Sequence, residues 1–228
     1  MITTPMHSAW AADVDAILAR DLPWHKLSGA KVLVTGAAGF LGGYLTRTLL
    51  ALHAAGKVDA PVRVVAMVRS LPRARTRFAD LLQRSDFELF EWDLNRIAVP
   101  ELPRCSHVLH AASQASPRFY GSDPVGTLMP NAIGTAALLE ALCRQPDPQA
   151  FLFVSSSEVY GTVPGDVSLP ETQYGSVDPA SVRATTKHQC ETWASEVQTF
   201  WPLMTHWSPS STALVCTLAR SEPALGSL

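Results

Sequence analysis

Short apolar runs alternate with longer amphipathic stretches through most of this chain. Apolar runs of about four to eight residues bounded by turn residues are typical of buried strands, whereas apolar residues at turn spacing indicate helices. The pattern predicts strands at 31–35, 62–69, 87–92, 107–111 and 151–155, and helices at 40–55, 73–84 and 124–144. Because strands that alternate with helices form sheets covered on both faces, we predict an α/β fold with a doubly wound parallel sheet.

A further amphipathic helix is predicted at 8–22, ahead of the first strand. One of its faces carries the apolar residues Trp10, Val14, Ile17 and Leu18. We expect this face to pack against the main body of the protein rather than to recruit a partner.

Three glycines follow the first predicted strand at the spacing Gly-x-x-Gly-x-x-Gly. Without a Cβ atom, Gly36 allows a tight turn, Gly39 lets the backbone approach a pyrophosphate, and Gly42 lets helix and strand pack closely. The helix that begins at Phe40 and Leu41 presents unpaired N–H groups and the positive end of its dipole to the same point. This context predicts the phosphate site of a Rossmann-type NAD(P)-binding domain; the alternative is a turn whose glycines serve packing alone.

The end of the second strand bears on the choice between NAD and NADP. A carboxylate there would bind the adenosine ribose of NAD, whereas a basic residue pairs with the extra phosphate of NADP. The sequence has Arg69 and no acid at this point, which favours NADP unless Arg69 points to solvent. Asp93 and Leu94 follow the third strand, where Asp93 is placed to meet the adenine amino group or, alternatively, to cap the next turn.

Composition and charge narrow the class of protein. With 228 residues of which 47% are hydrophobic, the chain can bury a sizeable core. Its formal net charge is −2, and its basic residues are dispersed. The one loose basic group comprises Arg69, Arg73, Arg75 and Arg77. This distribution does not resemble a nucleic-acid-binding stripe, so we expect no nucleic-acid partner.

Cysteine usage and the absence of a long apolar stretch indicate the compartment. The cysteines lie far apart and lack the spacing of metal ligands. They are Cys105, Cys143, Cys190 and Cys216. No stretch approaches the roughly 18 to 20 apolar residues of a membrane span, and the N-terminus lacks a secretory signal pattern. We therefore expect a cytoplasmic protein with reduced thiols, no metal site and no membrane partner.

Three further segments match the signatures of a known family. Residues 107–117 read His-Val-Leu-His-Ala-Ala-Ser-Gln-Ala-Ser-Pro, residues 123–135 run from Asp-Pro-Val to Asn-Ala-Ile-Gly-Thr, and residues 155–161 read Ser-Ser-Ser-Glu-Val-Tyr-Gly. Together with the glycine loop they resemble the extended short-chain dehydrogenase/reductases, the nucleotide-sugar epimerases, dehydratases and decarboxylases. The resemblance covers about residues 28–182 and is closest to the branch of UDP-glucuronate decarboxylases and dTDP-glucose 4,6-dehydratases.

The resemblance implies where the reaction takes place. In this family a hydride passes from a sugar carbon to the nicotinamide, and the keto sugar is then epimerised, dehydrated or decarboxylated. Ala111 and Ala112 would belong to the strand that backs the nicotinamide, and Asn131 would help to order the site. The hydroxyl of Ser156 would bind the reacting oxygen. Glu158 would assist loss of water in the dehydratase branch; the alternative is a plain loop carboxylate.

The family's Tyr-x-x-x-Lys signature is incomplete in this chain. The lysine, Lys187, would lower the pKa of the catalytic tyrosine and hold the ribose. Arg183 occupies the tyrosine's place or, if the alignment has a gap, matches an arginine that precedes it. The base is missing in both alignments, because a guanidinium stays protonated. Beyond Lys187 the resemblance fades, although 212–220 still predicts a strand. A frameshift near codon 184 would explain both departures, and reading the other frames of the gene tests it.

These observations divide the chain into an N-terminal helix with its lead-in (1–27), an NAD(P)-binding Rossmann domain (28–200) and a divergent or truncated tail (201–228), with most of the substrate domain expected to be absent. The predicted function is NAD(P)-dependent epimerisation, dehydration or decarboxylation of a UDP- or dTDP-sugar in polysaccharide biosynthesis. The alternative is a non-catalytic dinucleotide-binding module or a truncated pseudoenzyme. The resemblance also allows a homodimer through the helix at 124–144 and the helix after Lys187.

Overall fold

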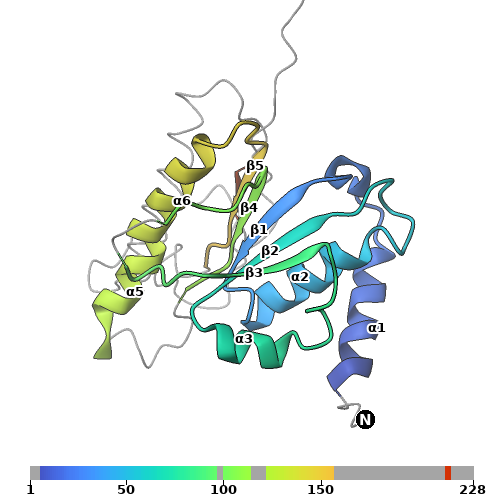
Figure 1. The fold of residues 1–228 in the computed structure, drawn as a ribbon, viewed down its shortest axis with the longest axis horizontal. Helices are drawn as coiled ribbons and strands as arrows, with labels where there is room; N and C mark the ends of the chain where they lie inside the picture. The colour runs from blue at the N-terminus through green and yellow to red at the C-terminus, as the bar shows by residue number, and fades with distance from the viewer. Residues whose placement is uncertain (1–5, 97–99, 114–121, 157–213, 217–228) are drawn as a thin grey trace, which may run out of the picture.

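The computed structural model describes residues 6–96, 100–113, 122–156 and 214–216 and contains a six-stranded sheet (Figure 1). Five strands run parallel: β1 (Lys31–Thr35), β2 (Arg63–Val68), β3 (Phe87–Glu91), β4 (His107–His110) and β5 (Ala150–Phe153). The sixth strand, β6 (Leu214–Cys216), pairs antiparallel with β5. The order is β3-β2-β1-β4-β5-β6, the doubly wound order of dinucleotide-binding folds. The predicted α/β fold class is confirmed, with the correction that the last strand is antiparallel.

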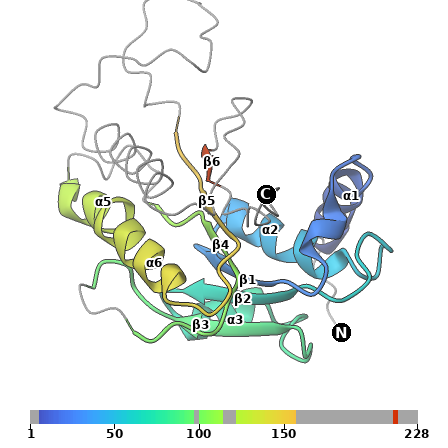
Figure 2. The ribbon, with the colours of Figure 1, turned by 90° about the horizontal axis from the view of Figure 1, so that it is seen from above.

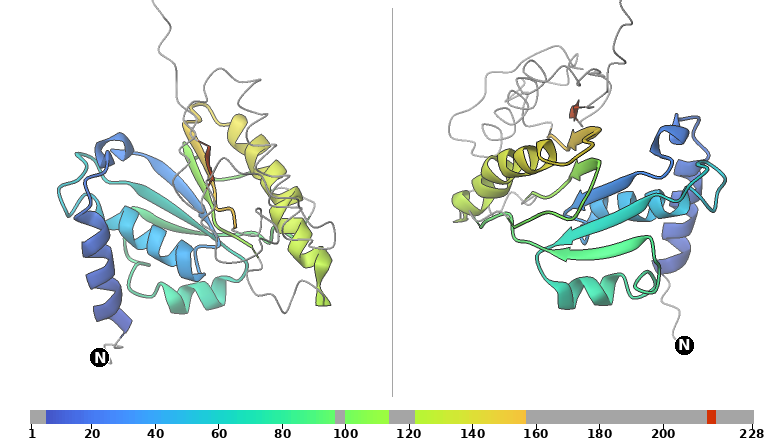
Figure 3. Two further views of the ribbon diagram at one scale, coloured as in Figure 1. Left: turned by 180° about the vertical axis from the view of Figure 1, so that it is seen from behind. Right: turned by 45° about the horizontal axis from the view of Figure 1, so that its top comes forward.

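Helices cover both faces of the sheet, as the two views of Figure 3 show. One face carries α1 (Met6–Leu18), α2 (Phe40–Ala51) and α3 (Leu71–Arg77), and the other carries α5 (Pro124–Asn131) and α6 (Ile133–Cys143). A short 3-10 helix, η1 (Trp24–Leu27), joins α1 to β1. We refer to the two sides as the α1–α3 face and the α5–α6 face; Figure 2 shows them from above.

Alternation along the central strands divides the core into two clusters. On β1, Val32 and Val34 point into the α1–α3 face, and Leu33 points into the α5–α6 face. The buried residues of β2 alternate in the same way. The α1–α3 face receives Val64, Ala66 and Val68, and the α5–α6 face receives Val65 and Met67. Because both faces are covered, these strands appear in the sequence as continuous apolar runs, which is why the sequence pattern located them correctly.

All four predicted helices have different bounds in the structure. The helix predicted at 8–22 spans Met6–Leu18, and the helix predicted at 40–55 ends at Ala51. The helix predicted at 73–84 begins at Leu71 and ends at Arg77. The apolar residues that suggested a longer helix lie in turns, from which Phe78 and Leu81 still enter the core. The helix predicted at 124–144 is two helices that meet at Ala132. Pro130 explains the interruption, since a proline inside a helix has no N–H to donate and crowds the preceding turn.

The stretch Pro124–Cys143 also corrects the expectation that no segment is apolar enough to cross a membrane. With a mean hydropathy of 1.2 over a membrane-length window, the stretch is long and apolar enough to cross a membrane, by length and composition alone. However, 56% of the window is buried inside the protein. Leu138, Leu139 and Leu142 pack in the core of the α5–α6 face, so burial against the sheet accounts for the apolar composition.

Candidate functional site

A cleft of about 520 Å³ opens at the carboxyl ends of the parallel strands. The chain turns in opposite directions after β1 and after β4, which are neighbours in the sheet, so their loops separate there. Ligands of doubly wound folds bind at this switch point. Most of the residues predicted to bind the cofactor line the cleft: Gly36, Gly39, Arg69, Asp93, Leu94, Ala111 and Ala112.

The glycine loop fits closely against the segment that follows β4. Gly36 has φ +63°, a left-handed conformation that favours glycine. A Cβ atom on Gly36 would lie 2.9 Å from the Cα of Ala112 and 3.0 Å from the carbonyl oxygen of Ala111. A Cβ atom on Gly42 would overlap the carbonyl of Gly36. The predicted need for glycine at both positions is therefore explained by backbone contact.

The start of α2 provides the predicted phosphate site through its backbone. Gly39 is the N-cap residue of α2, and its own N–H donates to the carbonyl of Gly36 over 2.8 Å. The first N–H groups of a helix have no acceptor within the helix, so those at the start of α2 can bind a phosphate. The side chains of Phe40 and Leu41 are 71% and 53% exposed and do not line the cleft. These two residues can therefore contribute only through the backbone, and the loop fits the pyrophosphate of a dinucleotide.

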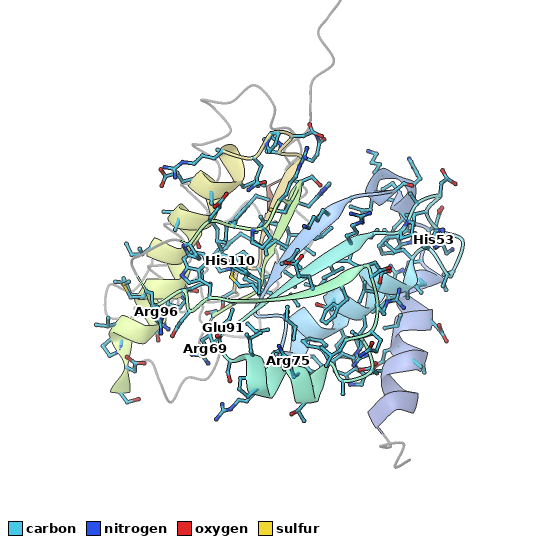
Figure 4. All side chains as sticks on the ribbon, viewed as in Figure 1. His53, Arg69, Arg75, Glu91, Arg96 and His110 are labelled. Atoms are coloured by element: carbon cyan, nitrogen blue, oxygen red, sulfur yellow. The ribbon has the colours of Figure 1, made fainter. Side chains whose placement is uncertain are left out.

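The end of β2 places a basic group at one end of the cleft. Arg69 is exposed and lines the cleft together with Ser70, Arg73 and Arg77 (Figure 4 labels Arg69). Within the described part of the chain, neither Arg69 nor Arg73 forms an ion pair. The nearby Glu91 carboxylate instead accepts the Leu71 N–H, at the start of α3, over 3.0 Å. The sequence identified Arg69 at the end of the second strand, whereas Arg73 and Arg77 were noted only as part of a loose basic cluster.

Asp93 takes one of the two roles that the sequence left open, the cap of the next turn, and its contact with adenine stays a prediction. Its Oδ1 atom accepts the backbone N–H of Asn95 over 3.1 Å and the Asn95 side-chain amide over 2.8 Å, so it does cap the following turn. It also lines the cleft, beside the buried Leu94. The turn therefore fixes the carboxylate at the wall where an adenine ring would lie.

A buried polar network that the sequence did not reveal supports the floor of the cleft. The Nδ1 atom of His110 lies 2.7 Å from Thr35 Oγ1, and its Nε2 atom lies 3.2 Å from the carbonyl oxygen of Pro130. Thr35 Oγ1 also accepts the backbone N–H of Ala112 over 3.1 Å. His110 is fully buried and packs edge-on against Phe151 (Figure 4 labels His110). The network joins β1, β4 and α5, and both Ala112 and Pro130 line the cleft.

The hydrogen-bond partners of His110 indicate which ring nitrogen carries the proton. The carbonyl of Pro130 can only accept, so Nε2 carries a proton. Thr35 Oγ1 accepts from Ala112 and can donate its own proton to Nδ1, which a neutral ring accepts. These two contacts therefore fit the neutral Nε2–H tautomer of His110.

The remaining predicted site residues lie away from the cleft or outside the described residues. Asn131 is fully buried at the end of α5 and does not line the cleft. Ser156 is half-buried in the segment after β5, which continues beside β4 through a hydrogen bond from the Val154 N–H to the carbonyl of His110. Glu158 and Lys187 lie outside the described residues.

Cys105 and Cys143 are free, and burial suppresses their reactivity. Burial raises the pKa of the Cys105 thiol to about 11, so the thiol stays protonated at neutral pH. The pKa of Cys143 is also raised, by burial and by the neighbouring charge of Glu140. Among the residues that the structure describes, no group of three or more His, Cys, Asp and Glu side chains is arranged to hold a metal ion.

Comparison with known proteins identifies the family of this chain. The family described as NAD dependent epimerase/dehydratase matches residues 32–199. UDP-glucuronate 4-epimerase 4 of Arabidopsis thaliana is 34% identical over 166 residues, covering 70% of this chain and 36% of the relative. UDP-glucuronic acid decarboxylase 2 of the same plant is 31% identical over 159 residues, covering 70% of this chain and 33% of the relative. The chain thus spans about a third of the length of these curated relatives.

A solved structure gives the same picture. The UDP-glucose 4-epimerase of Thermus thermophilus, in complex with NAD, is 30% identical to this chain with a TM-score of 0.58. The match covers 76% of this chain and 52% of that one. The likeness in fold therefore extends over about three quarters of this chain.

Proposed function

Because this chain belongs to the NAD-dependent epimerase/dehydratase family, we propose that its cleft binds a nicotinamide dinucleotide and that the protein modifies a nucleotide sugar. The observation that carries the proposal is the glycine loop at the switch point. Gly36 lies against Ala112 so closely that no side chain fits, and the start of α2 faces the same opening. A pyrophosphate is the ligand that this combination of a close backbone turn and a helix start suits.

The cleft supplies a distinct set of contacts to each part of a bound dinucleotide. The pyrophosphate would lie at the start of α2, the adenosine between the ends of β2 and β3, and the nicotinamide toward Ala111 and Ala112. When bound, the dinucleotide supplies the acceptor for a hydride. The chain's own residues position it above a floor held by the buried hydrogen bonds of His110. By the family resemblance, the hydroxyl of Ser156, in the segment after β5, would bind the reacting oxygen.

We propose further that the chain prefers NADP to NAD. Arg69 and Arg73 line the adenosine end of the cleft, and the described residues pair neither of them with a carboxylate. Arginine binds phosphate through charge-assisted hydrogen bonds, each of which contributes about 1.5 to 3 kcal/mol. Even one such bond to the additional phosphate would make the affinity for NADPH at least about tenfold higher than that for NADH.

The substrate is proposed from the relatives. They act on UDP-glucuronate and UDP-glucose, which supports a UDP- or dTDP-linked hexose as the substrate of this chain. A specific sequence feature favours a second candidate, a dinucleotide-binding module without catalysis. Arg183 either occupies the position of the catalytic tyrosine or matches an arginine that precedes it, and in both alignments the base is missing, because a guanidinium stays protonated.

Three apolar side chains exposed on the α5–α6 face support a homodimer. Val125 is 64% exposed, Ile133 42% and Leu128 38%. Exposed apolar side chains that gather on one surface favour contact with a partner. Sedimentation of the purified chain at two concentrations tests this, and a monomer at both concentrations would contradict it.

A titration of the full chain with NADPH and, separately, NADH tests the proposal. Energy transfer from the tryptophans to the reduced nicotinamide reports binding, and we expect saturation with tighter binding of NADPH. Arg69→Ala should remove the preference, whereas Arg75→Ala is a matched control, because Arg75 is exposed on α3 and does not line the cleft. No binding of either dinucleotide would contradict both candidate functions.

Turnover then separates the two candidates. Incubation with oxidised dinucleotide and UDP-glucuronate or UDP-glucose should form reduced nicotinamide or a changed sugar if the chain is an enzyme. A chain that binds the dinucleotide and leaves both sugars unchanged would support the non-catalytic module.

A further inference from the structure

The N-terminal helix α1 lies outside the part of the chain that matches the family, yet it is attached to the cofactor side of the fold. The family match begins at residue 32, whereas α1 spans Met6–Leu18. Val14 and Leu18 are buried in the core of the α1–α3 face. The hydroxyl of Tyr44, on α2, donates to Asp13 Oδ2 over 2.5 Å and holds the two helices together.

The ring of Trp10 packs α1 against α2. It stacks on Tyr44 with centroids 4.5 Å apart and an interplanar angle of 4°. The guanidinium groups of Arg47 and Arg77 lie 5.1 and 5.3 Å from the ring centroid, within the range of cation–π attraction. Gly43 leaves space for the ring, because a Cβ atom there would lie 2.6 Å from Trp10 Cη2. The position of the indole is therefore fixed from several sides.

Arg77 connects this indole to the glycine loop. Its Nη2 atom donates to the carbonyl oxygen of Gly39 over 3.2 Å. The same carbonyl accepts the N–H of Gly43 over 3.1 Å, the first hydrogen bond of α2. In a trans peptide the carbonyl and the following N–H point in opposite directions. A fixed Gly39 carbonyl therefore fixes the direction of the Phe40 N–H, one of the donors at the phosphate site.

We propose that Trp10 is a positioning residue for the dinucleotide site, acting through Arg77 on the carbonyl of Gly39. This role rests on the proposed function, since it requires that the glycine loop binds a dinucleotide. Trp10 itself does not line the cleft, so its effect on binding passes through Arg77, which does. The family-matched segment thus gains from α1 a contact that orients its phosphate-binding turn.

Calorimetric titration of the full chain with NADPH tests the role. Trp10→Ala should weaken binding by about threefold to fivefold, the loss of one partly exposed cation–π contact. Trp10→Phe keeps a ring over which Arg77 can lie and should restore most of the affinity. Gly43→Ala keeps Trp10 and Arg77 in the chain but displaces the indole, and its methyl group would also lie 3.3 Å from Arg77 Nη2, so it should weaken binding at least as much.

Trp24→Ala is the matched control, because it separates positioning from general loss of stability. Trp24 packs against the same core from η1, and its Nε1 atom donates to the carbonyl of Arg20 rather than to α2 or α3. It should lower the thermal midpoint and leave the NADPH affinity of the folded protein unchanged.

The outcomes distinguish this role from the proposed function. Failure of the wild-type chain to bind NADPH and NADH would overturn the proposed function and this role with it. Normal binding by the wild type together with unchanged affinity in Trp10→Ala would overturn the role of Trp10 alone. Equal weakening in Trp10→Ala and Trp24→Ala would also overturn it, because general destabilisation would then explain both.

Discussion

The two faces of the sheet are held by different kinds of contact. On the α1–α3 face, charged and aromatic side chains at the surface join the elements: Arg47 on α2 pairs with Asp80 in the turn after α3, and Trp10 on α1 stacks on Tyr44 on α2. On the α5–α6 face, the polar contact that joins strand to helix is buried, with His110 between Thr35 and Pro130. Both sets of contacts reach the same cleft through a residue that lines it, Arg77 on the first face and Pro130 on the second. We expect removal of a surface contact to lower the free energy of unfolding only modestly, and removal of the buried contact to lower it much more.

Removal of the buried contact should have the largest effect. His110→Ala leaves a cavity and removes a hydrogen-bond partner from Thr35 Oγ1 and from the Pro130 carbonyl, which should lower the free energy of unfolding by about 4 kcal/mol. Urea unfolding measures this loss. His53→Ala is the matched control, because His53 is exposed on the other face, and it should change stability by less than about 0.5 kcal/mol. Similar losses in the two variants would contradict the buried network.

The glycine loop, where the two faces meet, should give the next largest effect. Gly36→Ala combines left-handed strain of about 1 to 2 kcal/mol with an overlap on Ala112 that costs about 1 to 3 kcal/mol more. Gly56→Ala has the same strain, at φ +66°, with no atom near the added methyl group. Thermal unfolding of both variants should show a greater loss of stability in Gly36→Ala. NADPH titration should show a loss of binding in Gly36→Ala and not in Gly56→Ala. Equal effects would show that the close approach to Ala112 is unimportant.

A surface contact of the α1–α3 face should give a smaller effect. Arg47→Ala removes a two-point ion pair with Asp80 and one cation–π contact, so it should cost about 1 kcal/mol. Lys31→Ala removes a longer pair, 3.7 Å from Glu88, and should cost less than about 0.5 kcal/mol. Urea midpoints measure both, and a cost of Arg47→Ala as large as that of His110→Ala would remove the contrast between the faces.

The smallest effect concerns the pH dependence of stability. Hydrogen bonds from Arg84 lower the pKa of the Asp86 carboxyl below its usual value. A carboxyl with a lowered folded pKa stabilises the folded state above its unfolded pKa of about 3.9, and this contribution is lost as pH falls further. Thermal midpoints of the wild type and Asp86→Asn should therefore differ at neutral pH and converge in acid. A difference between the two thermal midpoints that persists to the lowest pH would show that the charge of Asp86 does not cause it.

Local patterns predicted the arrangement of the sheet and much of the cleft. The buried strands appear as apolar runs, and Gly36, Arg69 and Asp93 follow the ends of β1, β2 and β3, which meet at one edge of any parallel sheet. Their approximate place in the fold therefore depends on the order of elements alone.

Contacts between distant residues could not be predicted in this way. Thr35 and His110 are 75 positions apart, and only the register of β1 with β4 brings them together. The contact of Trp10 with Arg77 likewise depends on how α1 packs across α2. The break at Ala132 did have a local signal, Pro130, which the apolar periodicity on both sides obscured.

The single proton on Nε2 of His110 makes this ring a spectroscopic reporter for the cleft. Its two nitrogens contact different elements, Nδ1 the end of β1 and Nε2 the end of α5. In a protein labelled with nitrogen-15 at histidine, the two nitrogen resonances would register separately any change in the spacing of these elements. Addition of a dinucleotide could then be followed from inside the protein, with no probe attached to its surface.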